Sequence, residues 1–393
     1  MKIGVPRETS EGETRVALTP QIAGQLVGDG HEVLIQAGAG EASSNLDEAY
    51  REAGATVVPD AAQLYSQADM VLRVGRPSDE EVEMLRSGTV LIGTLGTLAM
   101  PELARKLAER GVSAVSMDAI PRITRAQSMD TLSSQATVGG YKAVLIAADR
   151  LPKFFPLLTT AAGTIRPARG IVMGAGVAGL MAIGTARRLG AVVEATDVRP
   201  VVKEQVESLG GTFIEVEMTD EEKKSAETAG GYATEMSEDY KRRQAALIAE
   251  RVKDADFIIT TALIPGRPAP KLVTDEMVKS MKAGSVIVDM AAEMGGNVEG
   301  TEPGKEVVKH GVLIVGHTNL PATMPASATQ MYAKNVQTLV KHLVKDGSVD
   351  LDFDDEITRG ATITHDGKVV HEATAKALAP EGNPATSAGD KGP

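Results

Sequence analysis

A glycine pattern between two short apolar runs constrains the fold of this chain more than any other feature. Ile171–Met173 precedes the loop Gly174-Ala175-Gly176-Val177-Ala178-Gly179, a helical stretch over Leu180–Leu189 and a second apolar run, Ala191–Thr196, that ends at Asp197. The first glycine permits a tight turn, the second allows close approach to a ligand, and the third lets the helix pack on the strand. This order predicts a nucleotide-binding α/β unit. The alternative is a tight turn in an α/β fold that binds no ligand.

The parts of this pattern together point to a dinucleotide. The N–H groups and the positive dipole end at the start of the helix favour phosphates. A carboxylate at Asp197 would accept hydrogen bonds from an adenosine ribose and repel a 2′-phosphate, which favours NAD(H) over NADP(H). Arg199 weakens that preference, because a nearby arginine is typical of NADP sites. The predicted contacts with the nucleotide in this region are Gly174, Gly176, Val177, Ala178, Gly179, Asp197, Val198 and Arg199.

Composition excludes several other classes of protein. A chain of 393 residues is long enough for two or three domains, and its formal net charge of −12 argues against a nucleic-acid binder. The absence of cysteine excludes disulfides, thiolate metal sites and a cysteine nucleophile. The six histidines show no metal-ligand spacing, so no metal is predicted. The N-terminus does not resemble a signal peptide, and the apolar stretch Phe154–Ile165 is too short to span a bilayer.

The alternation of strand and helix patterns predicts two Rossmann-like, doubly wound parallel-sheet domains, the first completed by the C-terminal segment. A helix over Ser133–Arg150 is expected to leave the first domain, and one over Ala328–Leu343 to return to it. The predicted boundaries are 1–135 with 319–375 for the first domain, 136–318 for the NAD-binding domain and 376–393 for a disordered tail. The strands expected in the first third are Lys2–Val5, His31–Gln36, Met70–Val74, Thr89–Ile92 and Ser113–Met117, with helices at Leu46–Ala53, Asp79–Leu85 and Pro101–Arg110.

Three loops after later strands are expected to face the nicotinamide, because open α/β sheets bind ligands at the carboxyl ends of their strands. They are Thr260–Gly266, with Thr261, Ala262 and Leu263 as predicted contacts, then Asp289–Gly296 and Gly316–Asn319. Asp289 is expected either to cap a loop or to touch the ligand, and Asn319 either to mark a domain junction or to touch it. The segment Glu217–Tyr240 is predicted to be a long exposed loop, either a functional lid or a disordered insertion.

A polar loop, Pro121–Gln135, is expected at the cleft between the domains. Arg122 and Asp130 are candidates for an ion pair, Gln127 is a candidate donor to a ligand, and Ser133 and Gln135 are candidates to bind a carboxamide. The alternative is a loop held by one ion pair and a serine helix cap. His317 is the only obvious acid or base in the predicted site loops. Direct hydride exchange between two nicotinamides suits such a site, because it needs proximity and orientation but no proton transfer at carbon.

From Met1 to about His371 the sequence resembles the NAD(H)-binding domain I of proton-translocating nicotinamide nucleotide transhydrogenases. The resemblance rests on Arg122–Gln135, Gly174–Gly179 with Asp197, Ala226–Ala233 and Thr260–Pro270. It implies that the loop carrying Arg122, Gln127 and Asp130 lies beside the nicotinamide. It further implies that Gln127 reaches toward the NADP(H)-bearing partner, that Ser133 contacts the carboxamide, and that Gly231 and Tyr232 lie on a loop that closes over the nucleotide.

The same resemblance implies an activity and partners. NADH bound to this chain would pass a hydride to NADP⁺ on a partner subunit, coupled to proton translocation across the membrane. The chain would be a homodimer, cytoplasmic and peripheral at the inner face of the bacterial plasma membrane, and associated with membrane-spanning and NADP(H)-binding subunits.

Alanine dehydrogenases provide the main alternative, since they resemble the chain at Gly4–Glu8 and Arg15–Pro20. That family carries a substrate lysine where this chain reads Arg73–Pro77, and a catalytic histidine where it reads Leu95–Leu98. Both groups are missing here, which disfavours amino-acid oxidoreduction. A third possibility is an NAD-binding regulator without catalytic activity.

Overall fold

The computed structural model describes residues 1–216, 219, 238–264 and 268–378, and the chain divides into two compact α/β units. Unit 1 comprises Met1–Leu132 and the chain from Thr329 onward, and unit 2 comprises Ser133–Ala328. The expected lid segment and tail fall largely outside the described residues, as do Gly231 and Tyr232. Of these two segments, the structure describes residue 219, residues 238–240, which begin a helix, and residues 376–378, which end one.

Within the described residues, unit 1 contains one eight-stranded sheet in the order β19-β18-β6-β5-β4-β1-β2-β3. The strands from β6 to β3 run parallel, and the C-terminal strands β18 and β19 join antiparallel at the β6 edge. The predicted completion of the first sheet by the C-terminal segment is therefore confirmed. The strand bounds are β1 Lys2–Val5, β2 Glu32–Gln36, β3 Thr56–Val58, β4 Met70–Leu72, β5 Val90–Gly93, β6 Ser113–Ser116, β18 Thr362–His365 and β19 Lys368–Val369, with a separate small hairpin β16 Val344–Lys345 and β17 Ser348–Val349.

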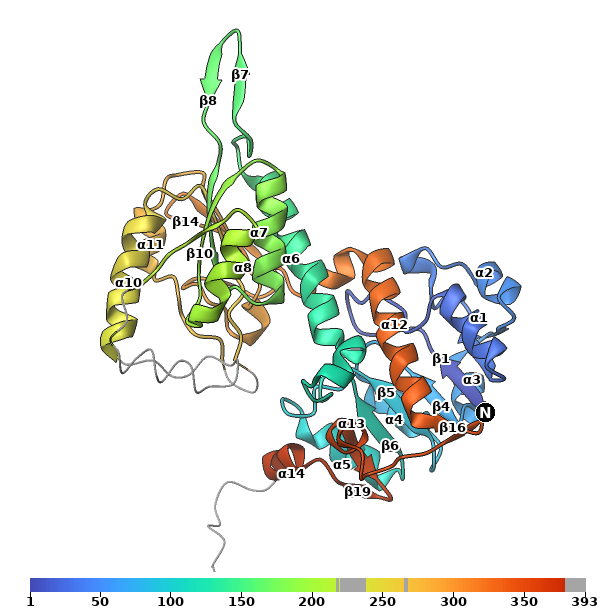
Figure 1. Cartoon of the computed structure of the whole chain (residues 1–393). Coiled ribbons are helices and arrows are strands. Elements are labelled where there is room, and N and C mark those ends of the chain that lie inside the picture. Colours follow the sequence, from blue (N-terminus) through green and yellow to red (C-terminus); the bar gives the residue numbers. More distant parts are fainter. Residues whose placement is uncertain (217–218, 220–237, 265–267, 379–393) are drawn as a thin grey trace, which may run out of the picture. The chain divides into compact units, whose positions relative to one another are not determined.

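Helices cover the two faces of this sheet, which have separate apolar cores (Figure 1). Local signals set their starts: Thr19 caps α1, and Ser78 forms a capping box with Glu81 at α4. The long helix α6 begins at Thr131 rather than at Ser133, so Ser133 lies inside the first turn instead of capping it. The helix bounds are α1 Pro20–Gly28, α2 Asp47–Glu52, α3 Ala61–Gln67, α4 Asp79–Met84, α5 Pro101–Glu109, α6 Thr131–Arg150, α12 Pro325–Leu343, α13 Glu356–Ala361 and α14 Glu372–Leu378.

Unit 2 contains a seven-stranded sheet, among the residues described, in the order β11-β10-β9-β12-β13-β15-β14. All neighbours are parallel except β14, which pairs antiparallel at one edge. The chain begins the sheet at β9, builds outward to β11 and then continues on the other side from β12, so the order reverses between β9 and β12. Open α/β sheets bind ligands at the carboxyl ends of the strands at such a reversal. The strands are β9 Arg169–Met173, β10 Val192–Thr196, β11 Thr212–Phe213, β12 Phe257–Thr260, β13 Val286–Asp289, β14 Glu306–Lys309 and β15 Val312–Val315.

Both faces of the unit 2 sheet are apolar and covered by helices. The packing is close where β9 meets β12: a side chain at Gly170 would overlap the ring of Phe257, which itself stacks on Phe155 at 4.7 Å between ring centroids. This contact requires a glycine on the central strand. The helices of this unit are α7 Val177–Arg188, α8 Lys203–Ser208, α10 Glu238–Val252 and α11 Asp275–Ser280, together with most of α6.

An isolated β-hairpin, β7 Leu158–Thr160 and β8 Gly163–Ile165, projects from the body of unit 2 (Figure 1). The large apolar side chains at its base and along it are exposed, at 55% for Phe154, 58% for Leu157 and 38% for Ile165. The apolar stretch noted in the sequence therefore belongs to a surface hairpin. Among the described helices, none has the length and apolarity needed to span a bilayer.

Candidate functional site

The glycine-rich loop, Gly174–Gly179, connects the end of β9 to the start of α7 as the sequence predicts. Gly174 has a φ of +100°, a conformation that other residues rarely adopt. A Cβ atom on Gly179 would lie only 1.8 Å from the carbonyl oxygen of Gly174, so the loop closes tightly onto the first turn of the helix. Helix α6 also approaches closely, since a Cβ on Gly140 would lie 2.1 Å from the carbonyl oxygen of Ala178.

This loop presents an open helix N-terminus. In the part of the chain that the structure describes, no side chain caps α7 at Gly176, and a Cβ on Gly176 would meet only the end of the Arg199 side chain, at 3.8 Å. Val177, the first helical residue, is 42% exposed. The unoccupied N–H groups of the first turn and the lack of a side chain at Gly176 fit the pyrophosphate of a dinucleotide.

Asp197 lies directly after β10, and its side chain is only 6% exposed. Oδ2 accepts hydrogen bonds from the backbone N–H of Ala175 at 2.8 Å and from Nη2 of Arg199 at 2.9 Å. Oδ1 accepts from Nε of Arg199 at 2.9 Å and from the backbone N–H of the same residue at 2.8 Å. Burial raises the pKa of Asp197, but the hydrogen bonds from Arg199 and Ala175 outweigh it and hold the pKa below its ordinary value. The carboxylate thus ties the glycine-rich loop to the end of the second strand.

Thr261, the first residue after β12, also supports the loop. Its hydroxyl donates to the carbonyl oxygen of Gly174 at 3.1 Å, and its backbone N–H donates to that of Met173 at 2.9 Å. Leu263, two residues further, is 55% exposed. The structure therefore brings together the ends of β9, β10 and β12, as the sequence predicts, with Thr261 turned toward the loop.

Two buried polar residues that hold the neighbouring loops were not fully anticipated. Asp289 is 1% exposed and accepts four hydrogen bonds, from Thr260, Ala291, Val298 and Thr301, so it caps the loop after β13.

Asn297 is fully buried and was missed, although it directly follows a glycine pair in the loop after β13. Its Nδ2 donates to the carbonyl oxygens of Ala262 and Pro270 at 2.9 and 2.8 Å, and its Oδ1 accepts from the N–H of Ala262 at 3.1 Å. These bonds clamp both ends of the segment after β12.

His317, the only obvious acid or base predicted in the loops, is part of an ion cluster. Its Nε2 lies 3.1 Å from the Glu306 carboxylate, which also pairs with Arg150 at 3.1 Å. Hydrogen bonding from Arg150 is the main reason why the pKa of Glu306 is lowered. The backbone N–H of Asn319, in turn, donates to the Glu293 carboxylate at 2.8 Å.

In unit 1, the predicted polar loop forms a 3-10 turn, η2 Thr124–Met129. Arg125 pairs with Asp355 at 2.6 Å, and Asn335 donates to the carbonyl oxygen of Ser128 at 2.8 Å, so C-terminal elements of the same unit hold the loop. Gln127 and Arg122 are exposed and Asp130 is half-buried.

At the start of unit 2, Ser133 is half-buried. Gln135, a candidate for the carboxamide, donates instead to the carbonyl oxygen of Ala328 at 3.1 Å.

The two positions that matter for the alanine dehydrogenase alternative are also occupied by structural interactions. Arg73 is fully buried and pairs with Glu8 at 3.1 Å and with Glu81. Arg15 forms a two-point contact with Glu13, at 2.6 Å for Nη2 and 2.8 Å for Nε. The buried guanidinium at position 73 is consumed by two carboxylates, so it is a structural group rather than a substrate-binding one.

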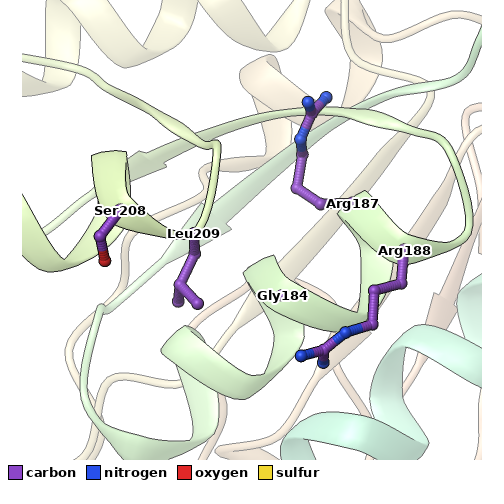
Figure 2. A pocket seen from close by; sticks show the side chains of 5 residues that line it. All are labelled: Gly184, Arg187, Arg188, Ser208 and Leu209. Atoms are coloured by element: carbon purple, nitrogen blue, oxygen red, sulfur yellow. The ribbon is translucent and has the colours of Figure 1, made fainter.

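A surface pocket of about 340 Å³ lies elsewhere on unit 2. It is lined by Gly184, Arg187 and Arg188 from α7 and by Ser208 and Leu209 at the end of α8 (Figure 2). These residues lie at the opposite end of α7 from the glycine-rich loop, so this pocket is separate from the candidate nucleotide site. The described residues contain no cluster of side chains suited to a metal ion.

Comparison with known proteins identifies the class to which this fold and site belong. Residues 4–139 match the N-terminal domain of the alanine dehydrogenase/PNT family, and residues 143–372 match its C-terminal domain. The chain belongs to this family.

Similarity within the family is greater to the transhydrogenase subunits than to the alanine dehydrogenases. The chain is 50% identical over 380 residues to the first of the polypeptides that form the NAD(P) transhydrogenase alpha subunit of Rhodospirillum rubrum, covering 95% of this chain and 98% of that one. Identity to the alanine dehydrogenase of Bacillus subtilis is 34%, covering 99% and 97%. The crystal structure of a transhydrogenase from Sinorhizobium meliloti matches with a TM-score of 0.86 and 46% identity, over 94% of this chain and all of that one.

Proposed function

We propose that this chain is the NAD(H)-binding subunit of a proton-translocating transhydrogenase. The observation that carries the proposal is a glycine-rich loop and acidic strand end suited to NAD(H), next to loops whose acidic and basic groups are held in structural contacts. Asp289 accepts four hydrogen bonds and His317 is paired with Glu306. Transfer of a hydride from NADH to NADP⁺ yields NAD⁺ and NADPH without a proton at the carbon centres, so this reaction requires positioning rather than a catalytic acid.

The roles of individual residues follow from the resemblance and from their places in the chain. Gly174–Gly179 would hold the pyrophosphate, with Asp197 at the adenosine ribose. Gln127 would reach toward the partner's NADP(H), between Arg122 and Asp130, which hold the loop. The exposure of Gln127 and the anchoring of its loop through Arg125 and Ser128 support a positioning role.

Further predicted contacts lie in unit 2 and in the segment outside the described residues. Ser133 would contact the carboxamide, and Ala262 and Leu263 would line the nicotinamide side. Gly231 and Tyr232 would belong to the closing loop.

Hydride transfer measured after mixing the chain with a purified NADP(H)-binding domain tests this function. NADH and an NADP⁺ analogue should react rapidly in the mixture, while the chain alone should not turn over pyruvate and ammonia. Turnover of pyruvate by the chain alone would establish the alanine dehydrogenase alternative. Binding of NADH without transfer in the mixture would establish a regulator.

A pair of glutamine variants tests the role of the unit 1 loop. Gln127→Ala should slow single-turnover transfer by about tenfold or more while NADH affinity stays within a few-fold, since only the reacting geometry is disturbed. Gln21→Ala, at another exposed glutamine in the first helix of the chain, is the matched control and should leave the rate unchanged. Equal rates in the two variants would remove Gln127 from the proposal.

We further propose that the chain acts as a homodimer, cytoplasmic and peripheral at the inner face of the plasma membrane, bound to membrane-spanning subunits. A two-stranded hairpin is marginally stable in water by itself, and β7–β8 carries exposed apolar groups, so a second copy of the chain is a suitable partner for it. In analytical ultracentrifugation, Leu157→Asp should shift the dimer to monomer, whereas Val308→Asp, at a 70% exposed valine on the β14 edge, should not. Co-sedimentation with vesicles that contain the membrane subunits tests the location.

A further inference from the structure

The carboxylate of Asp197 is saturated by groups of its own chain. A carboxylate offers about four acceptor positions. Two are filled by the backbone N–H groups of Ala175 and Arg199, and two by the Nε and Nη2 groups of the Arg199 side chain. A ribose diol can therefore use this carboxylate only if the guanidinium group of Arg199 gives up one or both of its positions.

The guanidinium group also lies where an adenosine ribose must pass. Its Nη2 atom is 3.8 Å from the position that a Cβ on Gly176 would occupy, at the point of closest backbone approach to a dinucleotide. The side chain is 28% exposed, so solvent and ligand reach it. In Rossmann units, a carboxylate at this place binds the 2′-hydroxyl of NAD, and an arginine nearby accommodates the 2′-phosphate of NADP. This chain holds both groups, joined to each other.

We propose that Arg199 is a 2′-phosphate-binding residue that Asp197 holds silent, so that this pair, and not the carboxylate alone, selects NAD(H) over NADP(H). This inference rests on the proposed NAD(H) site. In the pair, the positive charge is neutralised and the N–H groups are turned to Asp197, while the negative charge repels a phosphate. Loss of the carboxylate removes the repulsion and releases the arginine in one step.

Asp197→Asn is the sharpest substitution for this test. The amide oxygen of asparagine can still accept from the N–H of Ala175, which keeps the glycine-rich loop in place. Its NH₂ group would face the N–H groups of Arg199, and two donors cannot bond, so the arginine is released. Asp197→Ser serves as a second variant, because a hydroxyl can also accept from Ala175 and carries no charge.

The measurement is calorimetric binding of adenosine 2′,5′-bisphosphate and of 5′-AMP to the full chain, with NADPH and NADH as the complete nucleotides. The small probes restrict any effect to the adenosine half of the site. Asp197→Asn should bind the bisphosphate and NADPH about tenfold or more tightly than the wild type does, because a charged hydrogen-bonded pair forms with Arg199. The double variant with Arg199→Met should lose this gain.

The outcomes separate this inference from the function on which it rests. If wild-type chain fails to bind NADH, the proposed site itself is wrong. If the wild type binds NADH, but both folded Asp197 variants bind the bisphosphate no better than wild type does, Arg199 is only a structural partner of Asp197 and the inference is overturned. A gain that survives in the double variant would likewise overturn it, because another group would then bind the phosphate.

Discussion

Gly179→Ala, with Gly184→Ala on the same helix as control, tests whether the closed glycine-rich loop is what binds the nucleotide. The new methyl carbon at position 179 would lie 1.8 Å from the carbonyl oxygen of Gly174, where contacts below 3.0 Å are essentially never seen. Backbone must move by about 1 Å to relieve this overlap, and overpacking of this kind costs about 1–3 kcal/mol. At position 184 the added carbon meets only the ends of two side chains, Arg188 at 3.6 Å and Leu209 at 3.7 Å.

The two variants should therefore diverge in both stability and binding. Gly179→Ala should lower the melting temperature by a few degrees, at roughly 2–4 °C for each kcal/mol. It should also weaken NADH binding by about tenfold or more, which corresponds to about 1.4 kcal/mol of lost contact with the phosphates. Gly184→Ala should raise stability by up to about 1 kcal/mol through helix propensity and leave NADH affinity unchanged. Differential scanning calorimetry and NADH fluorescence titration measure both effects. Normal NADH binding by Gly179→Ala, or an equal loss in Gly184→Ala, would refute this account of the loop.

Three other perturbations give distinct expectations. Asn297→Ala leaves both backbone groups of Ala262 without their partner, so it should cost about 1–3 kcal/mol in thermal unfolding and weaken NADH binding, with little change in Asn45→Ala as control. Burial tends to raise the pKa of Asp355, but hydrogen bonds, the largest from Arg125, lower it to about 2, so its contribution to stability is present above about pH 4 and is lost as the pH falls toward 2; Asp355→Asn should flatten that part of the melting-temperature profile. Arg73→Met strands two buried carboxylates and should cost about 3–5 kcal/mol by urea denaturation; a neutral result would mean that the cluster is hydrated.

Alternating strand and helix patterns were enough to predict the layered fold and the reach of the C-terminal segment. The turn at Asp366-Gly367, for example, forms the expected hairpin, with both residues at positive φ. Short or polar elements escaped prediction, including β3, α3 and α10, because a few residues or a mostly charged surface give too weak a periodic signal.

The nucleotide loop could likewise be predicted, because its glycines are adjacent in sequence and their conformational demands are local. What holds it could not. Asn297 acts on Ala262 and Pro270, well before it in the chain, and this pairing is set only when β12 and β13 lie side by side. The two-point contact of Arg199 with Asp197 depends on rotamers that a sequence pattern does not specify.

The interruption of unit 1 by unit 2 sets the order in which the protein can be assembled on the ribosome. Unit 2 is synthesised as one continuous segment, and its last strand, β15, ends at Val315. Unit 1 lacks the edge pairing of β6 until β18 at Thr362–His365 has emerged. Domains generally fold as units during synthesis. The nucleotide-binding half can therefore be complete while the half that begins the chain still waits for its last strands.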